Sequence, residues 1–256
     1  MPPQGSKPEG TTDQASAAMA VQSMFNSIAP HYDLLNHVLS ATVDRLWWWR
    51  TARFFRRILA NPDARVLDIC CGTGDLTLAL LKHRPQGALP IFAADFAHAM
   101  LQRGAAKFAL HQSNAIAIEA DALHLPFPSQ SLDLVVSAFG FRNLANYEAG
   151  LAEFHRVLKP GGQLGILEFS EPGGPLGKLY ALYFRRVLPA IGRMICGTDG
   201  PYSYLPASVA RFPPPPEMLK MMHASGLADA SWTPYTLGIA GLYACQRPVA
   251  VSTDLY

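Results

Sequence analysis

Two glycines and two aspartates in this chain are spaced as in a site for a ligand that carries a ribose. Gly72 and Gly74 follow the apolar segment 65–69, and they permit a tight turn with close approach of the backbone to a ligand. Asp68 stands just before this turn, and Asp95 ends a second apolar segment, 89–94. An acidic residue at about this distance after a glycine turn binds ribose hydroxyls in nucleotide-binding α/β folds. The spacing therefore predicts a nucleoside site.

The same pattern fits two cofactors, NAD and S-adenosylmethionine. Thr77 stands where a dinucleotide fingerprint has its third glycine, and the chain contains no Tyr-x-x-x-Lys sequence. Both departures favour S-adenosylmethionine over NAD.

Two later loops add polar groups that belong at the same edge of the sheet, because ligands of open α/β sheets bind beyond the carboxyl ends of the strands. The segment 119–127 contains Asp121, which we expect to bind an adenine amino group, beside apolar Leu123 and Phe127. The segment 137–144 places Arg142 and Asn143 at the mouth of the predicted cleft.

Alternating apolar and amphipathic segments must position these loops. Strands are predicted over 65–70, 89–94, 115–119, 132–138 and 163–169, with helices over 75–84, 97–108 and 147–158 between them. This alternation predicts an α/β fold with a doubly wound, mostly parallel sheet. Lys159-Pro160-Gly161-Gly162 predicts a turn before the fifth strand. Strands near 231–235 and 238–245 are expected to close the sheet as an antiparallel hairpin.

The remaining segments suggest one domain with additions. Residues 1–20 are expected to be a disordered tail and 21–60 a helical arm or lid, broken at Pro30. The domain proper would span 61–247, followed by a short tail over 248–256. A Gly- and Pro-rich insertion over 171–216 interrupts the alternation, with no helix through Pro213–Pro216 and a helix over 217–225.

Composition narrows the class of protein. The 256 residues are 50% hydrophobic and 16% charged with a net charge of +2, so nucleic acid is not an expected partner. Four cysteines are too few for a disulfide framework or a zinc site, which favours buried thiols, no metal and a cytoplasmic location. Basic clusters over 45–57 and 178–193 fit either a membrane surface or an ordinary folded domain.

Longer motifs resemble known enzymes. Asp121-Ala122 with the following Leu-Pro-Phe-Pro, and Arg-Val-Leu-Lys-Pro-Gly-Gly over 156–162, resemble class I S-adenosylmethionine-dependent methyltransferases. Tyr-Asp-Leu-Leu-Asn-His-Val-Leu-Ser over 32–40, Phe-Gly-Phe-Arg-Asn over 139–143, Leu-Glu-Phe-Ser over 167–170 and Tyr-x-Tyr-Leu-Pro-x-Ser-Val-x-x-Phe-Pro over 202–213 resemble the UbiE/MenG family of quinone-ring C-methyltransferases. The resemblance covers about residues 21–245.

This resemblance implies a seven-stranded class I methyltransferase sheet with an antiparallel last strand, and S-adenosylmethionine as the cofactor. The cofactor would be bound by residues of the first four strand ends: Asp68, Gly72, Thr73, Gly74, Asp95, Asp121, Ala122 and Ser137. Two departures stand out. Cys70-Cys71 replaces the glycines or Ala-Gly usual before Gly-Thr-Gly, which resembles cyanobacterial, phylloquinone-forming members, and Asp44 replaces the histidine of a His-x-x-Trp motif.

The implied reaction is transfer of a methyl group to a ring carbon of a prenylated demethylnaphthoquinol, either 2-phytyl-1,4-naphthoquinol or demethylmenaquinol. Carbon is a poor nucleophile, and an ionised hydroquinone overcomes this by pushing electron density onto the ring. We expect Arg142 to stabilise the oxyanion, and His31, Tyr32 and Asp33 to move the proton from an N-terminal lid. Structural alternatives stay open: a salt bridge for Arg142, an exposed turn for His31 and a core position for Tyr32.

Other functions also fit. A benzoquinol C-methyltransferase of the ubiquinone pathway, a small-molecule O- or N-methyltransferase, and a non-catalytic scaffold subunit remain alternatives. A prenylated acceptor would live in the membrane, so peripheral membrane contact is expected. A homo-oligomer is compatible with the sequence.

Overall fold

The computed structural model describes residues 5–32, 42–170, 172 and 200–249. Within this part of the chain the strands form a seven-stranded sheet in the order β3-β2-β1-β4-β5-β7-β6. The strands are β1 (Val66–Ile69), β2 (Ile91–Asp95), β3 (Ala115–Glu119), β4 (Leu132–Ala138), β5 (Leu158–Phe169), β6 (Ala228–Tyr235) and β7 (Ala240–Gln246). β7 runs antiparallel to both of its neighbours, β5 and β6, and the other strand pairs described are parallel. The doubly wound, mostly parallel sheet and its antiparallel last strand are confirmed.

The strand order reverses at β1. β1 pairs with β2 on one side and with β4 on the other, so Asp68 lies between Ala93 and Val136. The chain leaves β1 and β4 toward opposite edges of the sheet, which opens a crevice at their carboxyl ends. The loop after β1 and the loop after β4, which both belong to the predicted site, therefore meet in this crevice.

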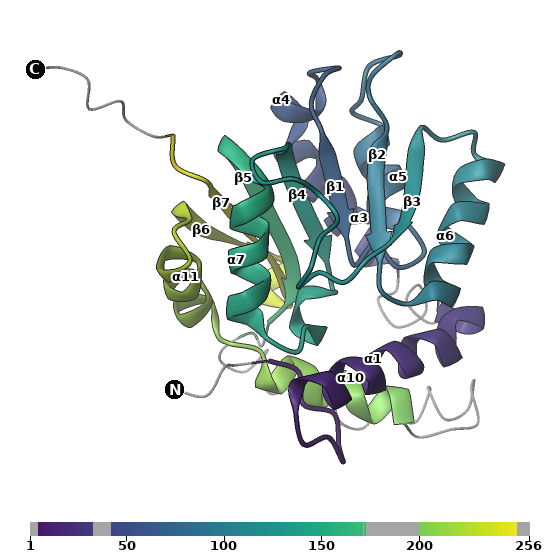
Figure 1. Cartoon of the computed structure of the whole chain (residues 1–256), viewed down its shortest axis with the longest axis vertical. Coiled ribbons are helices and arrows are strands. Elements are labelled where there is room, and N and C mark those ends of the chain that lie inside the picture. The colour runs from purple at the N-terminus through teal and green to yellow at the C-terminus, as the bar shows by residue number, and fades with distance from the viewer. Residues whose placement is uncertain (1–4, 33–41, 171, 173–199, 250–256) are drawn as a thin grey trace, which may run out of the picture.

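Helices cover both faces of the sheet (Figure 1). α3 (Val43–Phe54), α4 (Arg56–Leu59) and α5 (Asp75–Leu81) pack on one face, where Trp47, Trp48 and Phe55 are buried. α7 (Tyr147–Val157) and α11 (Pro215–Ala224) pack on the other, and α6 (His98–Leu110) lies along β2 and β3. Two further helices, α1 (Gln14–Ile28) and α10 (Gly200–Arg211), cross the carboxyl edge of the strands (Figure 1).

The N-terminal segment differs from expectation. Residues 5–20 are not a disordered tail, because α1 begins at Gln14 and Asp13 forms a capping box with Ser16. In this box the Ser16 N–H donates to Asp13 Oδ1 at 2.7 Å, and the Asp13 N–H donates to Ser16 Oγ at 3.1 Å. The Ser6 N–H also donates to the Leu144 carbonyl at 2.7 Å, which ties the segment before α1 to the domain.

Two proline- and glycine-containing segments also differ. β5 starts at Leu158, so the predicted turn over 159–162 lies inside the strand as an irregularity between the pairs Leu132–Leu158 and Leu134–Gln163. α11 starts at Pro215, because proline is tolerated in the first helical turn. The expected break at Pro30 is present: α1 ends at Ile28, and the short helix η1 (Ala29–His31) follows.

Some expectations fall outside the described residues. These are the side chains of the motif after Tyr32, most of the insertion over 171–216 with its basic cluster, and both chain ends. In the part of the chain that the structure describes, no helix is both long and apolar enough to cross a bilayer.

Candidate active site

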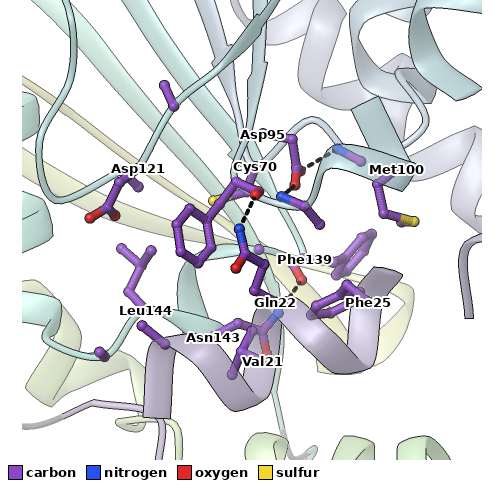
Figure 2. A pocket seen from close by; sticks show the side chains of 18 of the residues that line it. Val21, Gln22, Phe25, Cys70, Asp95, Met100, Asp121, Phe139, Asn143 and Leu144 are labelled. Atoms are coloured by element: carbon purple, nitrogen blue, oxygen red, sulfur yellow. Dashed lines mark hydrogen bonds between the residues drawn. The ribbon is translucent and has the colours of Figure 1, made fainter. Parts of the chain in front are cut away.

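A pocket lies at the crevice between β1 and β4. Figure 2 shows α1 closing one side of it and the loops after the strands forming the other sides. One side of the pocket, here called the donor side, is formed by the loops after β1, β2 and β3. Its residues are Cys70, Gly72, Asp95, Phe96, Ala97, Met100, Ala120, Asp121, Ala122 and Leu123. Residues 138–145, here called the β4 wall, contribute Ala138, Phe139, Gly140, Asn143, Leu144 and Ala145.

The turn between β1 and α5 has the backbone that the glycines were expected to provide. Gly72 and Gly74 have φ of 55° and 85°, in the left-handed region. The Gly72 N–H donates to Asp95 Oδ2 at 2.7 Å, and the Ala97 N–H donates to Asp95 Oδ1 at 2.8 Å. A Cβ on Gly74 would lie 2.4 Å from the Phe108 ring. Asp95 therefore both lines the pocket and holds the turn in place.

Asp68 lies behind this turn and is not among the residues that line the pocket. Its side chain is fully buried, and Thr77 Oγ1 donates to Asp68 Oδ2 at 2.6 Å. Burial raises the pKa of Asp68 to about 7, against the opposing effect of the Thr77 hydrogen bond. Asp68 Oδ1 has no hydrogen-bond partner among the described residues.

Thr73 belongs to a polar cluster on the outer side of the turn. Lys107 Nζ, from α6, donates to Thr73 Oγ1 at 3.2 Å and to Asp75 Oδ1 at 2.9 Å. Lys107 thus supports the turn from a helix that is distant in sequence. Sequence reasoning missed it, because a lysine in an amphipathic helix carries no distinguishing pattern.

The β3 end matches expectation more directly. Asp121 and Ala122 both line the pocket. Asp121 Oδ1 accepts the Leu123 N–H at 2.9 Å, and Oδ2 lies 3.1 Å from His124 Nδ1. Ser137, by contrast, is buried beside the Cys70 thiol and does not line the pocket.

Backbone strain gathers where β1 and β4 end. Cys70 and Phe139 both have φ of 57°, which costs a non-glycine residue about 1–2 kcal/mol. A Cβ on the neighbouring Gly140 would lie 2.2 Å from Cys70 Cβ, so the two loops fit only with glycine there. Burial raises the pKa of the Cys70 and Cys71 thiols well above the usual value, which keeps both protonated.

Arg142 forms a buried ion pair with Glu168, which is the structural alternative to a catalytic role that the sequence left open for this residue. Its Nη1 donates to Glu168 Oε2 at 3.0 Å, and its backbone N–H donates to Glu168 Oε1 at 2.9 Å. Nη1 also donates to the Phe139 carbonyl. Burial alone would lower the pKa of Arg142, but Glu168, Tyr32 and Tyr204 together raise it, so the guanidinium stays charged. It lies behind the residues that line the pocket.

Tyr32 lies on the pocket wall, with its ring edge-on to Phe25 at 6.1 Å between centroids. His31 ends η1, and its side chain is outside the described part of the structure. The structure thus brings Tyr32 to the pocket and places Arg142 one layer behind it.

α1 supplies one wall of the pocket, and this helix begins at Gln14, before the helical arm predicted over 21–60. Ala18, Val21, Gln22 and Phe25 face the pocket (Figure 2). Gln22 Nε2 donates to the Phe96 carbonyl at 2.8 Å, which fastens α1 to the loop after Asp95. The Asp-x-x-Ser sequence over 13–16 is the signal that could have placed the start of this helix.

The residues present fit a nucleoside with a charged sulfur substituent. The donor side offers a glycine turn with room for a ligand, two carboxylates at strand ends and the apolar side chains of Met100 and Leu123. The remaining walls are mainly apolar, which suits a flat hydrophobic second ligand.

Comparison with known proteins also indicates a methyltransferase. A model of the ubiE/COQ5 methyltransferase family matches residues 11–247. The demethylmenaquinone methyltransferase of Deinococcus radiodurans is 46% identical over 232 residues, 90% of this chain and 94% of that protein. The demethylmenaquinone methyltransferase of Thermus thermophilus is 45% identical over 226 residues, 88% of this chain and 100% of that protein. UbiE, the ubiquinone/menaquinone biosynthesis C-methyltransferase of Geobacter sulfurreducens, is 40% identical over 230 residues, 89% of this chain and 88% of that protein.

Solved structures share the fold. An S-adenosylmethionine-dependent methyltransferase of Thermotoga maritima has a TM-score of 0.62 and 15% identity, over 88% of this chain and 99% of that chain. A methyltransferase of Aquifex aeolicus with the same dependence has a TM-score of 0.53 and 16% identity, over 75% of this chain and 93% of that chain. The expected class I methyltransferase sheet is confirmed.

Proposed function

Since this chain belongs to the ubiE/COQ5 methyltransferase family, we propose that it methylates a ring carbon of a prenylated demethylnaphthoquinol, with demethylmenaquinol as the first acceptor to test. The chain is an S-adenosylmethionine-dependent methyltransferase. Two relatives, at 46% and 45% identity, are demethylmenaquinone methyltransferases. The phylloquinone-forming assignment, with 2-phytyl-1,4-naphthoquinol as acceptor, stays a prediction.

One observation carries the proposal: the pocket has a polar donor side and an apolar remainder. Asp95, Asp121 and the Gly72 turn fit the nucleoside of the cofactor. Phe25, on α1, and Leu144, on the β4 wall, leave a hydrophobic space opposite these groups (Figure 2). A planar quinol ring with an apolar tail fits such a space better than a charged amine or a sugar does.

Bound S-adenosylmethionine would supply an electrophilic methyl group on a positively charged sulfur. The protein must then favour the ionised quinol, because loss of the hydroxyl proton raises electron density at the ring carbon. We assign Tyr32 and Asn143, which line the pocket, to hydrogen bonding with the quinol oxygen. Arg142 acts through the wall: its charge, although paired with Glu168, favours the phenolate electrostatically. His31 stays a candidate for the proton transfer.

The test is transfer of a labelled methyl group from S-adenosylmethionine to demethylmenaquinol under reducing conditions. We expect a carbon-methylated product. Parallel reactions with 2-phytyl-1,4-naphthoquinol and with a prenylated benzoquinol rank the acceptor rings. Methylation of oxygen or nitrogen acceptors only would overturn the proposal in favour of a small-molecule methyltransferase, and cofactor binding without transfer would favour a scaffold.

Peripheral membrane contact is part of this proposal, and one surface supports it. A groove along α3 and α4 is lined by Arg50, Arg53, Arg56 and Arg57, and no Asp or Glu is among its lining residues. The Trp49 and Phe54 side chains beside these arginines are 47% and 50% exposed. Arginines next to exposed aromatic rings are typical of protein surfaces that bind anionic lipid headgroups. We call this groove the α3 arginine surface.

A further inference from the structure

α10 contacts the turn η2 (Phe141–Asn143) through hydrogen bonds between side chains that are far apart in the sequence. The Tyr204 hydroxyl donates to Asn143 Oδ1 at 3.1 Å. Arg142 Nε donates to Ser208 Oγ at 3.3 Å. The motifs over 139–143 and 202–213 were linked in the sequence only by their resemblance to the same family. In the structure they contact each other directly.

A third contact between this segment and η2 is made by aromatic rings. The Phe212 ring packs edge-on against Phe141, with 6.3 Å between centroids, and against Tyr147 at 5.6 Å. Tyr204, Ser208 and Phe212 recur at every fourth position, so they share one face of the helical run. That face contacts all three residues of η2, which fixes how η2 and the β4 wall sit relative to α10.

The hydrogen bonds from α10 fix the orientation of the Asn143 and Arg142 side chains. Asn143 lines the pocket, and its Nδ2 donates to the Phe139 carbonyl at 3.4 Å while Tyr204 holds its Oδ1. Both ends of this amide are therefore fixed. The Ser208 hydroxyl donates to the Leu205 carbonyl at 2.9 Å, which turns an oxygen lone pair toward Arg142 Nε.

α10 is also joined to the segment before α1. Arg211 Nη1 donates to the Lys7 carbonyl at 2.6 Å, and Tyr204 lies beside Ser6. Tyr204 therefore lies where the N-terminal segment, α10 and the β4 wall meet. A residue at this junction can set the orientation of the wall without touching the ligand.

We propose that Tyr204 and Ser208 are positioning residues for methyl transfer: Tyr204 orients Asn143 in the pocket wall, and Ser208 holds Arg142 behind that wall. This inference rests on the proposed function, because the acceptor is the ligand that the β4 wall faces. The loops after β1, β2 and β3 hold the cofactor side, and neither Tyr204 nor Ser208 contacts them among the hydrogen bonds of the described residues. Their loss should therefore affect turnover of the quinol and spare cofactor affinity.

The first experiment removes one hydroxyl at a time. Tyr204→Phe is expected to lower kcat for the quinol about tenfold, the effect of one hydrogen bond in a buried site, with the Kd for S-adenosylmethionine unchanged. Tyr243→Phe is the matched control, because the Tyr243 hydroxyl is buried without a hydrogen-bond partner among the described residues. Ser208→Ala is compared in the same way with Ser225→Ala, because the Ser225 hydroxyl donates to the Met221 carbonyl at the end of α11, away from η2.

The second experiment asks whether Tyr204 acts through Asn143. If it does, Tyr204→Phe lowers kcat in the unaltered protein and has little further effect in an Asn143→Ala background. Additive losses would overturn the inference, as would an unchanged kcat in Tyr204→Phe or an equal loss in Tyr243→Phe. If the unaltered enzyme methylates no quinol, the proposed function fails and this inference with it. Normal transfer by the unaltered enzyme and by Tyr204→Phe rejects the inference alone.

Discussion

The Arg142 guanidinium and the Glu168 carboxylate are both buried, and Arg142 Nη1 donates to Glu168 Oε2 while the Arg142 backbone N–H donates to Glu168 Oε1. A buried charge without its partner is far more costly than a lost surface pair, because desolvation is no longer compensated. At the residue scale this pair therefore contributes to stability as well as to the electrostatics of the pocket.

We expect Arg142→Ala to lower the free energy of unfolding by about 3–5 kcal/mol, measured by denaturant titration. Lys159→Ala is the control, because the Lys159–Asp133 pair is partly exposed and its loss should cost about 1 kcal/mol or less. Adding Glu168→Gln to Arg142→Ala should recover part of the loss by removing the unpaired carboxylate. A loss no larger than that of the control would contradict the buried-pair interpretation.

Gly74 permits a second residue-scale prediction. Alanine there would have to adopt φ of 85° and would place its Cβ 2.4 Å from Phe108. We expect Gly74→Ala to weaken S-adenosylmethionine binding at least tenfold, measured by calorimetry, because the turn must shift. Gly87→Ala is a matched control: Gly87 has φ of 77° and open space around its missing Cβ, so only the backbone strain of about 1–2 kcal/mol applies. Equal binding by the two variants would show that the Phe108 contact is unimportant.

At the scale of elements, the sequence predicted β1 to β4 and the helices α5, α6 and α7 to within three residues at each end, and it predicted the starts of β5 and α1 less well. β1, β2, β3 and β4 lie within two residues of the predicted ranges. β1, β2 and β4 are buried and nearly continuous apolar runs, and β3 is a short run of Ala and Ile that ends at Glu119. α1 was placed too late, since its first turns are small and polar residues such as Ser16 and Ala17. Its stability comes from packing and from its cap, neither of which periodicity reveals.

The residues of the site likewise divide into those that the sequence predicted and those that it did not. Gly72, Asp95 and Asp121 were predictable because their chemistry follows from position after a strand. Lys107 and Tyr204 were not assigned a role, because their partners are brought to them by the fold across 34 and 61 residues. Long-range hydrogen bonds leave no spacing in the sequence to detect.

At the scale of the whole molecule, the α3 arginine surface makes membrane contact testable. Charge reversal of Arg53, Arg56 and Arg57 together is expected to weaken binding to phosphatidylglycerol vesicles at least about 100-fold, since each basic residue near an anionic surface contributes about 1 kcal/mol. Vesicle co-sedimentation measures this, and neutral phosphatidylcholine vesicles should bind weakly throughout. Lys220→Glu, at an exposed position of α11, is the control. Equal binding by both variants would place the contact elsewhere.

The close approach of Cys70 and Gly140 has a consequence for how this protein could have evolved. A side chain at position 140 would occupy the space already filled by Cys70 Cβ, at 2.2 Å. Position 70, whose backbone is left-handed, accepts glycine with relief of strain. The two positions can therefore change in one order only: a lineage could acquire a side chain at 140 only after position 70 had become glycine, and restoring a side chain at 70 would then be blocked.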